Sequence, residues 1–128
     1  METKKLIQEL HADNLEWLNR LSFYEDEILF LQHQIDQIAA KYKGDNVLAL
    51  CESFSNRLII QRNNIHKIRD EVRMQERALA LEEIADPVGA EFRYYPDEEE
   101  ERAEMETFER IYADLKEDLL QFFSKVRR

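Results

Sequence analysis

Apolar side chains recur at alternating steps of three and four residues along the first third of the chain. The row consists of Ile7, Leu10, Asn14, Trp17, Leu21, Tyr24, Ile28, Leu31, Ile35, Ile38 and Tyr42, and Asn14 is its plainly polar member. An average step of 3.5 residues keeps these side chains on one face of an α-helix, in the heptad pattern of helices that pack lengthwise. We call such a row the seam of its helix. The pattern predicts a long helix over residues 4–43.

The same spacing occurs in two further stretches of the chain. It predicts a second long helix over residues 46–85 and a shorter third helix over residues 97–126. The second seam consists of Val47, Cys51, Phe54, Leu58, Gln61, Ile65, Ile68, Val72, Gln75, Leu79 and Glu82. The third seam consists of Met105, Phe108, Tyr112, Leu115, Leu119, Phe122 and Val126. Helices of this kind bury their seams against one another, so the predicted fold class is all-α.

All glycine and proline residues fall between these stretches. They are Gly44, Pro87, Gly89 and Pro96, and these two residue types are the strongest interruptions of local structure. The short link at Gly44 forces the first two helices to lie antiparallel. For two residues that face each other across the first and second helices, the two residue numbers should then add up to about 89. Asn14 and Gln75, each a polar member of its seam, are therefore expected to be neighbours.

We predict one domain over residues 1–128, an antiparallel three-helix bundle of coiled-coil type. Its two long helices and its shorter third helix are joined by the link at Gly44 and by an aromatic connection over residues 87–96. Apolar side chains gain free energy by leaving water. Those of the connection, Val88, Phe92 and Tyr94 or Tyr95, are therefore expected to pack over one end of the bundle.

The charge distribution fits the same arrangement of helices. Residues 57–77 carry six basic and three acidic side chains, whereas residues 9–36 and 98–118 are strongly acidic. A basic middle helix between two acidic ones favours this pairing. The whole chain has 36% charged residues and a formal net charge of −10. Such acidity disfavours contact with nucleic acids and with anionic membranes.

The sequence gives no sign of a membrane or secreted protein. Its longest aliphatic and aromatic run, residues 28–31, is far shorter than the roughly 20 residues that a membrane-spanning helix needs. No signal-peptide pattern precedes the first helix, and the single cysteine, Cys51, cannot form an internal disulfide. We therefore expect a cytoplasmic protein in a reducing compartment.

The sequence carries none of the usual signatures of catalytic, cofactor or metal sites. His11, His33 and His66 lie on different turns, and none has the glutamate-histidine spacing of di-iron bundles. Cys51 occupies a seam position, where a buried and unreactive thiol is expected. We predict no catalytic residue, no cofactor and no metal ligand.

Some apolar side chains of the first helix lie off its seam. These are Leu15, Phe23, Leu29 and Phe30, and comparable positions on the other helices hold Ile59, Ile60, Leu120 and Phe123. Contiguous apolar surface of this kind marks contacts with other molecules. We predict a non-enzymatic interaction or scaffold protein. It is expected to bind a protein partner, or a second copy as a dimer, through this surface of the first helix.

A function of another class also fits a helical bundle. The alternative is a bundle that binds a small molecule or a metal, or an accessory subunit of an enzyme, with a cavity near Trp17 and the aromatic connection. A pocket lined by Trp17, Phe92 and Tyr94 favours this alternative. A filled core with an apolar outer strip favours the interaction protein.

Overall fold

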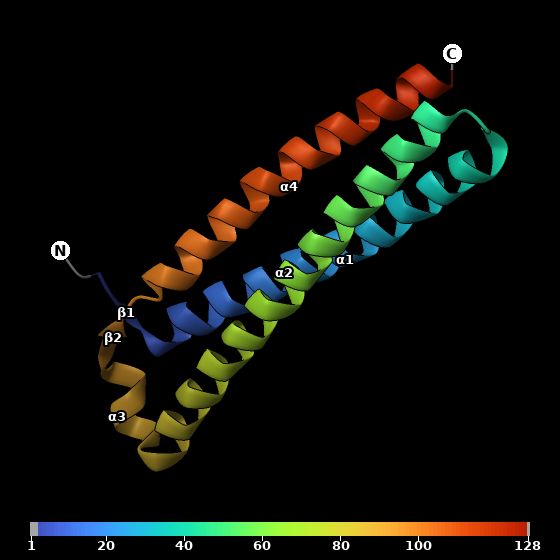
Figure 1. Ribbon diagram of the computed structural model, residues 1–128. Coiled ribbons are helices and arrows are strands. Elements are labelled where there is room, and N and C mark those ends of the chain that lie inside the picture. The colour runs from blue at the N-terminus through green and yellow to red at the C-terminus, as the bar shows by residue number, and fades with distance from the viewer. Residues whose placement is uncertain (1–2, 128) are drawn as a thin grey trace.

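The computed structural model describes residues 3–127, which form four α-helices and one pair of short β-strands. The long helices are α1 (Ile7–Lys41), α2 (Asp45–Ala85) and α4 (Glu99–Val126), and α3 (Pro87–Phe92) is a short helix between α2 and α4. The strands are β1 (Lys4–Leu6) and β2 (Tyr94–Pro96). Figure 1 shows the three long helices lying lengthwise beside one another, with the strand pair and α3 at one end. The predicted all-helical character is confirmed, apart from the strand pair.

The predicted seams form the core of the molecule. Every predicted position of α1 is buried except Tyr24 and Tyr42, which are half-buried. Every predicted position of α4 is buried except Val126, which packs against the edge of the core. In α2 the row is buried from Cys51 to Val72, and it ends at an exposed Glu82. The heptad spacing therefore identified which side chains leave water.

Phe123 differs from the prediction, because it is buried rather than exposed on the outside of α4. Its ring centroid lies 6.1 Å from that of Phe122, and both rings belong to the main core cluster. A helix that packs against two neighbours buries a wider strip than two positions per heptad. Leu120, which was expected on the same outer side, is exposed.

Polar contacts between the long helices follow a regular order. From α1 to α2 the pairs are Gln32 with Ser55, Glu25 with Arg69, and His11 with Glu76. From α1 to α4 they are Asp13 with Arg102, Arg20 with Glu109, and Glu27 with Lys116. As the residue number increases along α1, the residue number of the α2 partner decreases, whereas that of the α4 partner increases. The α1 to α2 pairs agree with the expected register to within about two turns of helix.

The helix ends differ from the sequence expectation. The first helix was expected from residue 4 but begins at Ile7, because residues 4–6 pair with β2. Gly44 has φ −69° and ψ 137° and directly precedes α2. The second helix begins at Asp45, one residue earlier than expected, and α4 begins at Glu99 rather than at residue 97.

The connection between α2 and α4 packs through small or partly buried residues rather than through its largest apolar ones. Val88 and Phe92 are exposed, contrary to the prediction. Of the two tyrosines, either of which was expected to pack, Tyr94 is exposed and Tyr95 packs. Ala90 is fully buried and Tyr95 is half-buried in a second small core. The other members of this core are Ile7, Leu10 and Leu79. A six-residue helix has room for one buried face, and in α3 that face belongs to Ala90.

Candidate interaction surface

The four apolar side chains predicted to lie on the outside of α1 are all exposed. Leu15, Phe23, Leu29 and Phe30 each leave between 52% and 61% of their surface accessible to solvent. We call these four residues the α1 surface. Each lies on a turn whose seam residues are buried, so the helix is held in place while these side chains remain available for contact.

The α1 surface consists of two rows rather than one stripe. Phe23 and Phe30 are seven residues apart and share one row. Leu15 and Leu29 share a second row, about 100° away around the helix. Exposed Asp26 lies on the same outward side of α1. The phenylalanines and the leucines therefore face partly different directions.

Leu29 borders an apolar groove between α1 and α2. The groove has a volume of about 270 Å³ and is lined by Ile28, Leu29, Gln32, Ser55, Leu58, Ile59 and Arg62. The Gln32 amide donates to the Ser55 hydroxyl at 2.9 Å across the two helices. Ile59 is about as exposed as Leu29. The structure thus brings together two off-seam residues from different helices, whereas Leu15 does not line this groove.

Phe23 rests against the aromatic edge of the core. Its ring lies edge-on to the ring of Tyr24, with centroids 5.9 Å apart. Tyr24 packs edge-on against Phe108 and Tyr112 of α4, and its hydroxyl donates to Glu109. A side chain supported in this way loses less conformational freedom on binding than a free one.

Basic residues of α2 contact acidic residues of both neighbouring helices, as the charge distribution predicted. Arg69 lies 3.3 Å from Glu25 of α1, and Lys67 lies 3.2 Å from Glu104 of α4. Arg57 lies 3.1 Å from Asp118 of α4. Exposed pairs of this kind each stabilise a protein by about 0.2–1 kcal/mol. Their main effect is on which helices pair and in which order.

A partly buried polar cluster lies near the start of α4. Asn14 is fully buried, and its amide nitrogen donates to Glu76 at 2.7 Å and to Glu98 at 3.1 Å. His11 Nδ1 lies 2.9 Å from both carboxylate oxygens of Glu76, and His11 Nε2 contacts Glu83. We call these five residues the polar cluster. The expected partner of Asn14 was Gln75, and the structure gives the hydrogen bond to its neighbour in sequence, Glu76.

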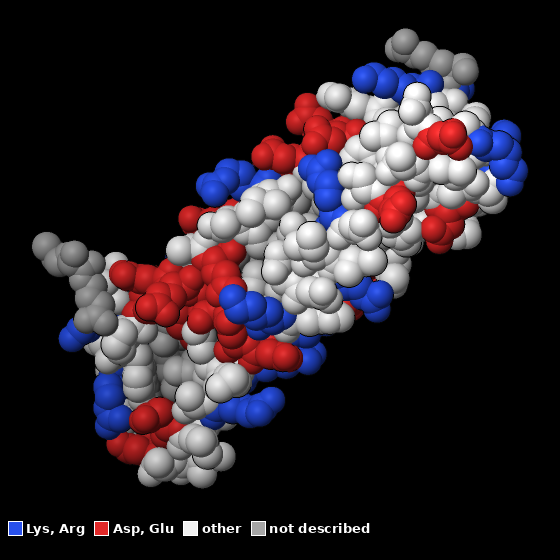
Figure 2. All heavy atoms as spheres, viewed as in Figure 1, with Lys and Arg blue, Asp and Glu red and all other residues white. Residues whose placement is uncertain are grey.

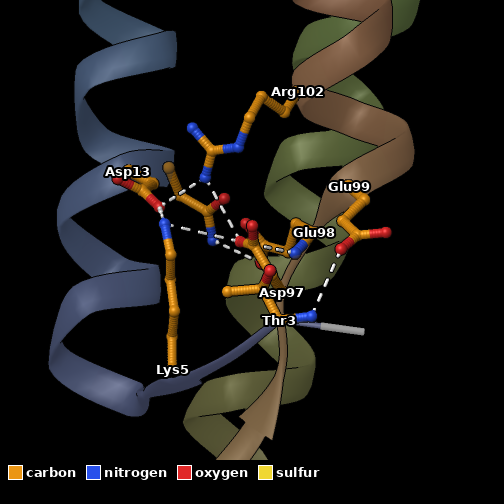
Figure 3. A network of polar contacts seen from close by, with 8 residues as sticks. Thr3, Lys5, Asp13, Asp97, Glu98, Glu99 and Arg102 are labelled. Carbon is orange, nitrogen blue, oxygen red and sulfur yellow. Dashed lines mark hydrogen bonds and ion pairs between the residues drawn. The ribbon is translucent and has the colours of Figure 1, made fainter. Parts of the chain in front are cut away.

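A network of ion pairs lies beside the polar cluster (Figure 3). Lys5 Nζ lies 2.8 Å from Asp13 and 3.6 Å from Asp97. Arg102 lies 2.9 Å from Asp13 and 3.2 Å from Asp97, and its guanidinium stacks over the Trp17 ring at 5.2 Å. The two cations therefore hold β1, α1 and the start of α4 together. Their carboxylate partners are Asp13 and Asp97.

Glu98 was missed by the sequence reasoning, which began the third seam at Met105. Two steps back from Met105, of four and three residues, reach Glu101 and Glu98, so the heptad spacing does contain a signal for them. Burial raises the pKa of Glu98 to about 7. The hydrogen bond from Asn14 opposes this shift, while the carboxylates of Glu76, Asp13 and Asp97 add to it.

This shift predicts a pH-dependent stability. The ordinary pKa of 4.5 rises to about 7 in the folded chain, so between these values folded Glu98 keeps a proton that the unfolded chain has lost. Stability should therefore fall as the pH rises through this window. The Glu98→Gln variant lacks the titrating group. It should be more stable than the natural chain at pH 8 by on the order of 1–2 kcal/mol, after allowance for solvent screening.

The measurement is urea unfolding of the natural chain and of Glu98→Gln at about pH 5 and about pH 8. These values lie near the two ends of the pH range over which the protonation of Glu98 changes stability. The advantage of Glu98→Gln should be small at the lower pH and full at the higher one. Exposed Glu106 of α4 gives the matched control, because Glu106→Gln removes the same charge without any burial. An advantage of Glu98→Gln that is equal at both pH values would show that Glu98 titrates normally.

The remaining candidates for chemistry lie apart from one another. His66 pairs with Glu25 at 2.7 Å, and His33 contacts Gln37 of its own helix at 3.3 Å. The Cys51 thiol is buried, and burial raises its pKa. Trp17 is buried in the main core, whereas Phe92 and Tyr94 are exposed. The structure therefore gives no support to a shared pocket lined by these three aromatic residues.

Comparison of the chain with models of known families, with curated proteins and with solved structures gave no match. Among residues 3–127, no helix has both the length and the apolar character needed to cross a membrane. The geometry of the chain itself is therefore the basis for the function proposed below.

Proposed function

We propose that this chain is a non-enzymatic interaction protein that dimerises through the α1 surface. It acts as an antiparallel three-helix bundle of coiled-coil type, which presents Leu15, Phe23, Leu29 and Phe30 on a stiff support in the cytoplasm. The observation that carries the proposal is the pair of exposed phenylalanines, Phe23 and Phe30, on one outward row of a helix whose opposite face is fully packed.

The packing of the long helices supports the scaffold part of this proposal. Seam residues of α1, α2 and α4 share one core cluster, and ion pairs tie α2 to each of the other two. The falling order of the α1 to α2 pairs supports the antiparallel part of the proposal. A surface that is held in its binding conformation by a packed core lowers the entropic cost of association.

The geometry of the α1 surface supports association of two copies. A two-fold axis crossing α1 near Asp26 would set Phe23 of each copy opposite Phe30 of the other, because a two-fold contact exchanges the residues at equal distances from its axis. Burial of one such ring contributes about 1.5–3 kcal/mol. Four rings that are each about 60% exposed, with Leu29 beside them, offer apolar area for a modest dimer.

The alternative proposal is a bundle that binds a metal or a small molecule, or an accessory subunit of an enzyme. One observation favours its metal-binding form. The polar cluster around Asn14 brings carboxylates from two separate segments to one buried amide. This cluster lies near the start of α4, away from the middle turns of α1 that carry Phe23 and Phe30, so both functions are compatible with one molecule.

Light scattering of the full chain tests the main proposal. The monomer mass is 15.4 kDa, and the measured mass should rise towards twice that value as the concentration increases through the micromolar range. This concentration dependence follows from mass action for a modest dimer. A mass that stays at that of the monomer throughout the range would rule out self-association and leave a different protein as the partner of the α1 surface.

A further inference from the structure

We propose that charges at the two ends of α1 orient the dimer, so that two copies of the chain pair antiparallel along α1. Lys41 of each copy then lies between Glu9 and Glu16 of the other copy. This inference rests on the proposed function, because it applies to a chain that associates through the α1 surface. It is carried by a second heptad row on α1, by the charges along that row, and by the register that Phe23 and Phe30 set.

The second heptad row runs along the outward side of α1. Its members follow one another at steps of three and four residues, which keeps them on one face of the helix. They are Ala12, Glu16, Asn19, Phe23, Asp26, Phe30, His33, Gln37 and Lys41, and all of them are exposed. We call this the outer row. Helices that pack along heptad rows cross at only about 20°, so two copies would meet over most of the length of α1.

The outer row is apolar in its middle and charged towards its ends. Phe23 and Phe30 lie in the middle of the row. Exposed Glu16 lies seven residues before Phe23, and exposed Glu9 lies seven residues before Glu16. Lys41 lies about five turns after Phe23, on the same side of the helix. The start of the row is therefore negative and its end is positive.

The rest of the molecule has the same direction of charge. Lys41 and Arg127, which follows α4, line one shallow pocket, so a second cation adds to the positive charge where α1 ends. Figure 2 shows basic side chains at the end of the molecule where α4 ends and a large group of acidic side chains over the start of α4. Two copies that lie in opposite directions bring unlike charges together, whereas copies in the same direction bring like charges together.

The two phenylalanines set the register of the antiparallel pair. When Phe23 of one copy faces Phe30 of the other, the numbers of facing residues add up to 53. Lys41 then faces Ala12, and Glu16 lies about one turn from Ala12. Side chains one turn apart are neighbours on a helix surface, so the lysine reaches this carboxylate. In a parallel pair, Glu16 instead faces Glu16 and Lys41 faces Lys41.

Two further charges near the outer row do not alter this choice. Asp26 lies close to the two-fold axis, where it approaches its own copy in either orientation, and both carboxylates are screened by water and salt. Glu16 contacts Arg20 of its own helix. A carboxylate accepts more than one hydrogen bond, so Glu16 can interact with Lys41 of the other copy at the same time.

Disulfide formation between introduced cysteines reads the orientation directly. In a Cys51→Ser background, Asn19→Cys and Gln34→Cys are made as two separate proteins. Their residue numbers add up to 53, so the antiparallel dimer brings the two new thiols together, and only the mixture should give a cross-linked dimer on a non-reducing gel. Two copies of the same variant hold their thiols about 22 Å apart, too far for a disulfide. In a parallel dimer each variant would cross-link with itself.

Charge reversal tests the residues that set the orientation, with light scattering over a range of concentrations as the measurement. Lys41→Glu should raise the dissociation constant on the order of tenfold at low ionic strength, since each dimer contains this contact twice. Adding Glu9→Lys and Glu16→Lys to the same chain should restore most of the affinity, and about 0.5 M NaCl should remove the difference. The matched control is Arg73→Glu, an equal change of charge at an exposed position of α2, which should leave the dissociation constant within about twofold.

The outcomes separate the orientation from the proposed function. Cross-linking in the mixture alone, with loss and recovery of affinity in the charge variants, is the expected result. Cross-linking of each variant with itself, or equal weakening by Lys41→Glu and Arg73→Glu, overturns the orientation by charge and leaves association through the α1 surface standing. A dimer mass without any cross-link overturns the α1 surface as the contact. A mass that stays at that of the monomer overturns self-association and this inference together.

Discussion

Changing Phe23 and Phe30 together to glutamate is expected to convert the proposed dimer into a monomer while leaving the helices folded. Both rings are about 60% exposed in the single chain, so their replacement opens no cavity in the core. At a two-fold contact the two changes bring four negative charges together and remove four apolar rings. The dissociation constant should rise at least about 100-fold, because burial of each ring contributes about 1.5–3 kcal/mol.

Light scattering gives the mass of this variant, and circular dichroism gives its helix content and midpoint of unfolding. The matched control is the double change Met74→Glu and Leu81→Glu. These residues are also exposed, also seven apart, and lie on α2. The control should still dimerise. If both double variants dissociate, the contact is not specific to α1, and if the Phe23 and Phe30 variant unfolds, those rings belong to the core.

Truncating a fully buried side chain should have the largest effect on stability. Ile65 of α2 has 0% of its surface exposed and belongs to the main core. Ile65→Ala is expected to lower the free energy of unfolding by about 2–5 kcal/mol, through lost burial and the cavity left behind. Ile60→Ala, on the same helix but at a side chain that is 55% exposed, should change it by less than about 0.5 kcal/mol.

Urea unfolding of the two variants measures this difference directly. Both substitutions remove the same atoms and introduce the same helix-favouring residue, so helix propensity cancels between them. Comparable losses at Ile65 and Ile60 would mean that the α2 seam does not face the core.

The seams were predictable because helical periodicity is a local property. Leu58 and Ile65 differ from Ile59 and Ile60 only in their phase along the chain, and this phase decides which of them are buried. Off-seam positions next to the seam are less certain. Phe123 is buried because α4 contacts two other helices. The apolar pattern of one helix does not show how many other helices pack against it.

The end of the molecule near the start of α4 was not predictable in the same way. Its structure depends on contacts between residues about 90 positions apart, such as Lys5 with Tyr95, and local propensity does not encode them. The same reason explains why Ala90 rather than Phe92 was selected for burial. Asn14 was correctly expected to be buried with a polar partner on α2, although that partner is Glu76.

The polar cluster shows how far composition alone can mislead. Glu98 belongs to a run of acidic residues, and such runs are usually solvated. Its place in the heptad and its position beside Asn14 make it different from Glu99 and Glu100, which are exposed. The difference between Glu98 and the two glutamates that follow it depends on how α4 packs against α1.

The pairing of β1 with β2 has a consequence for the order in which the molecule assembles. It closes a loop of about 90 residues, and the entropy lost on closing so long a loop is recovered only if other contacts have already shortened it. Packing of α1 against α2 provides that shortening, since it brings Glu76 of α2 to His11 and Asn14 near the start of the chain. Folding should therefore proceed from the Gly44 link towards the strands, and opening of the native state should begin where the strands meet.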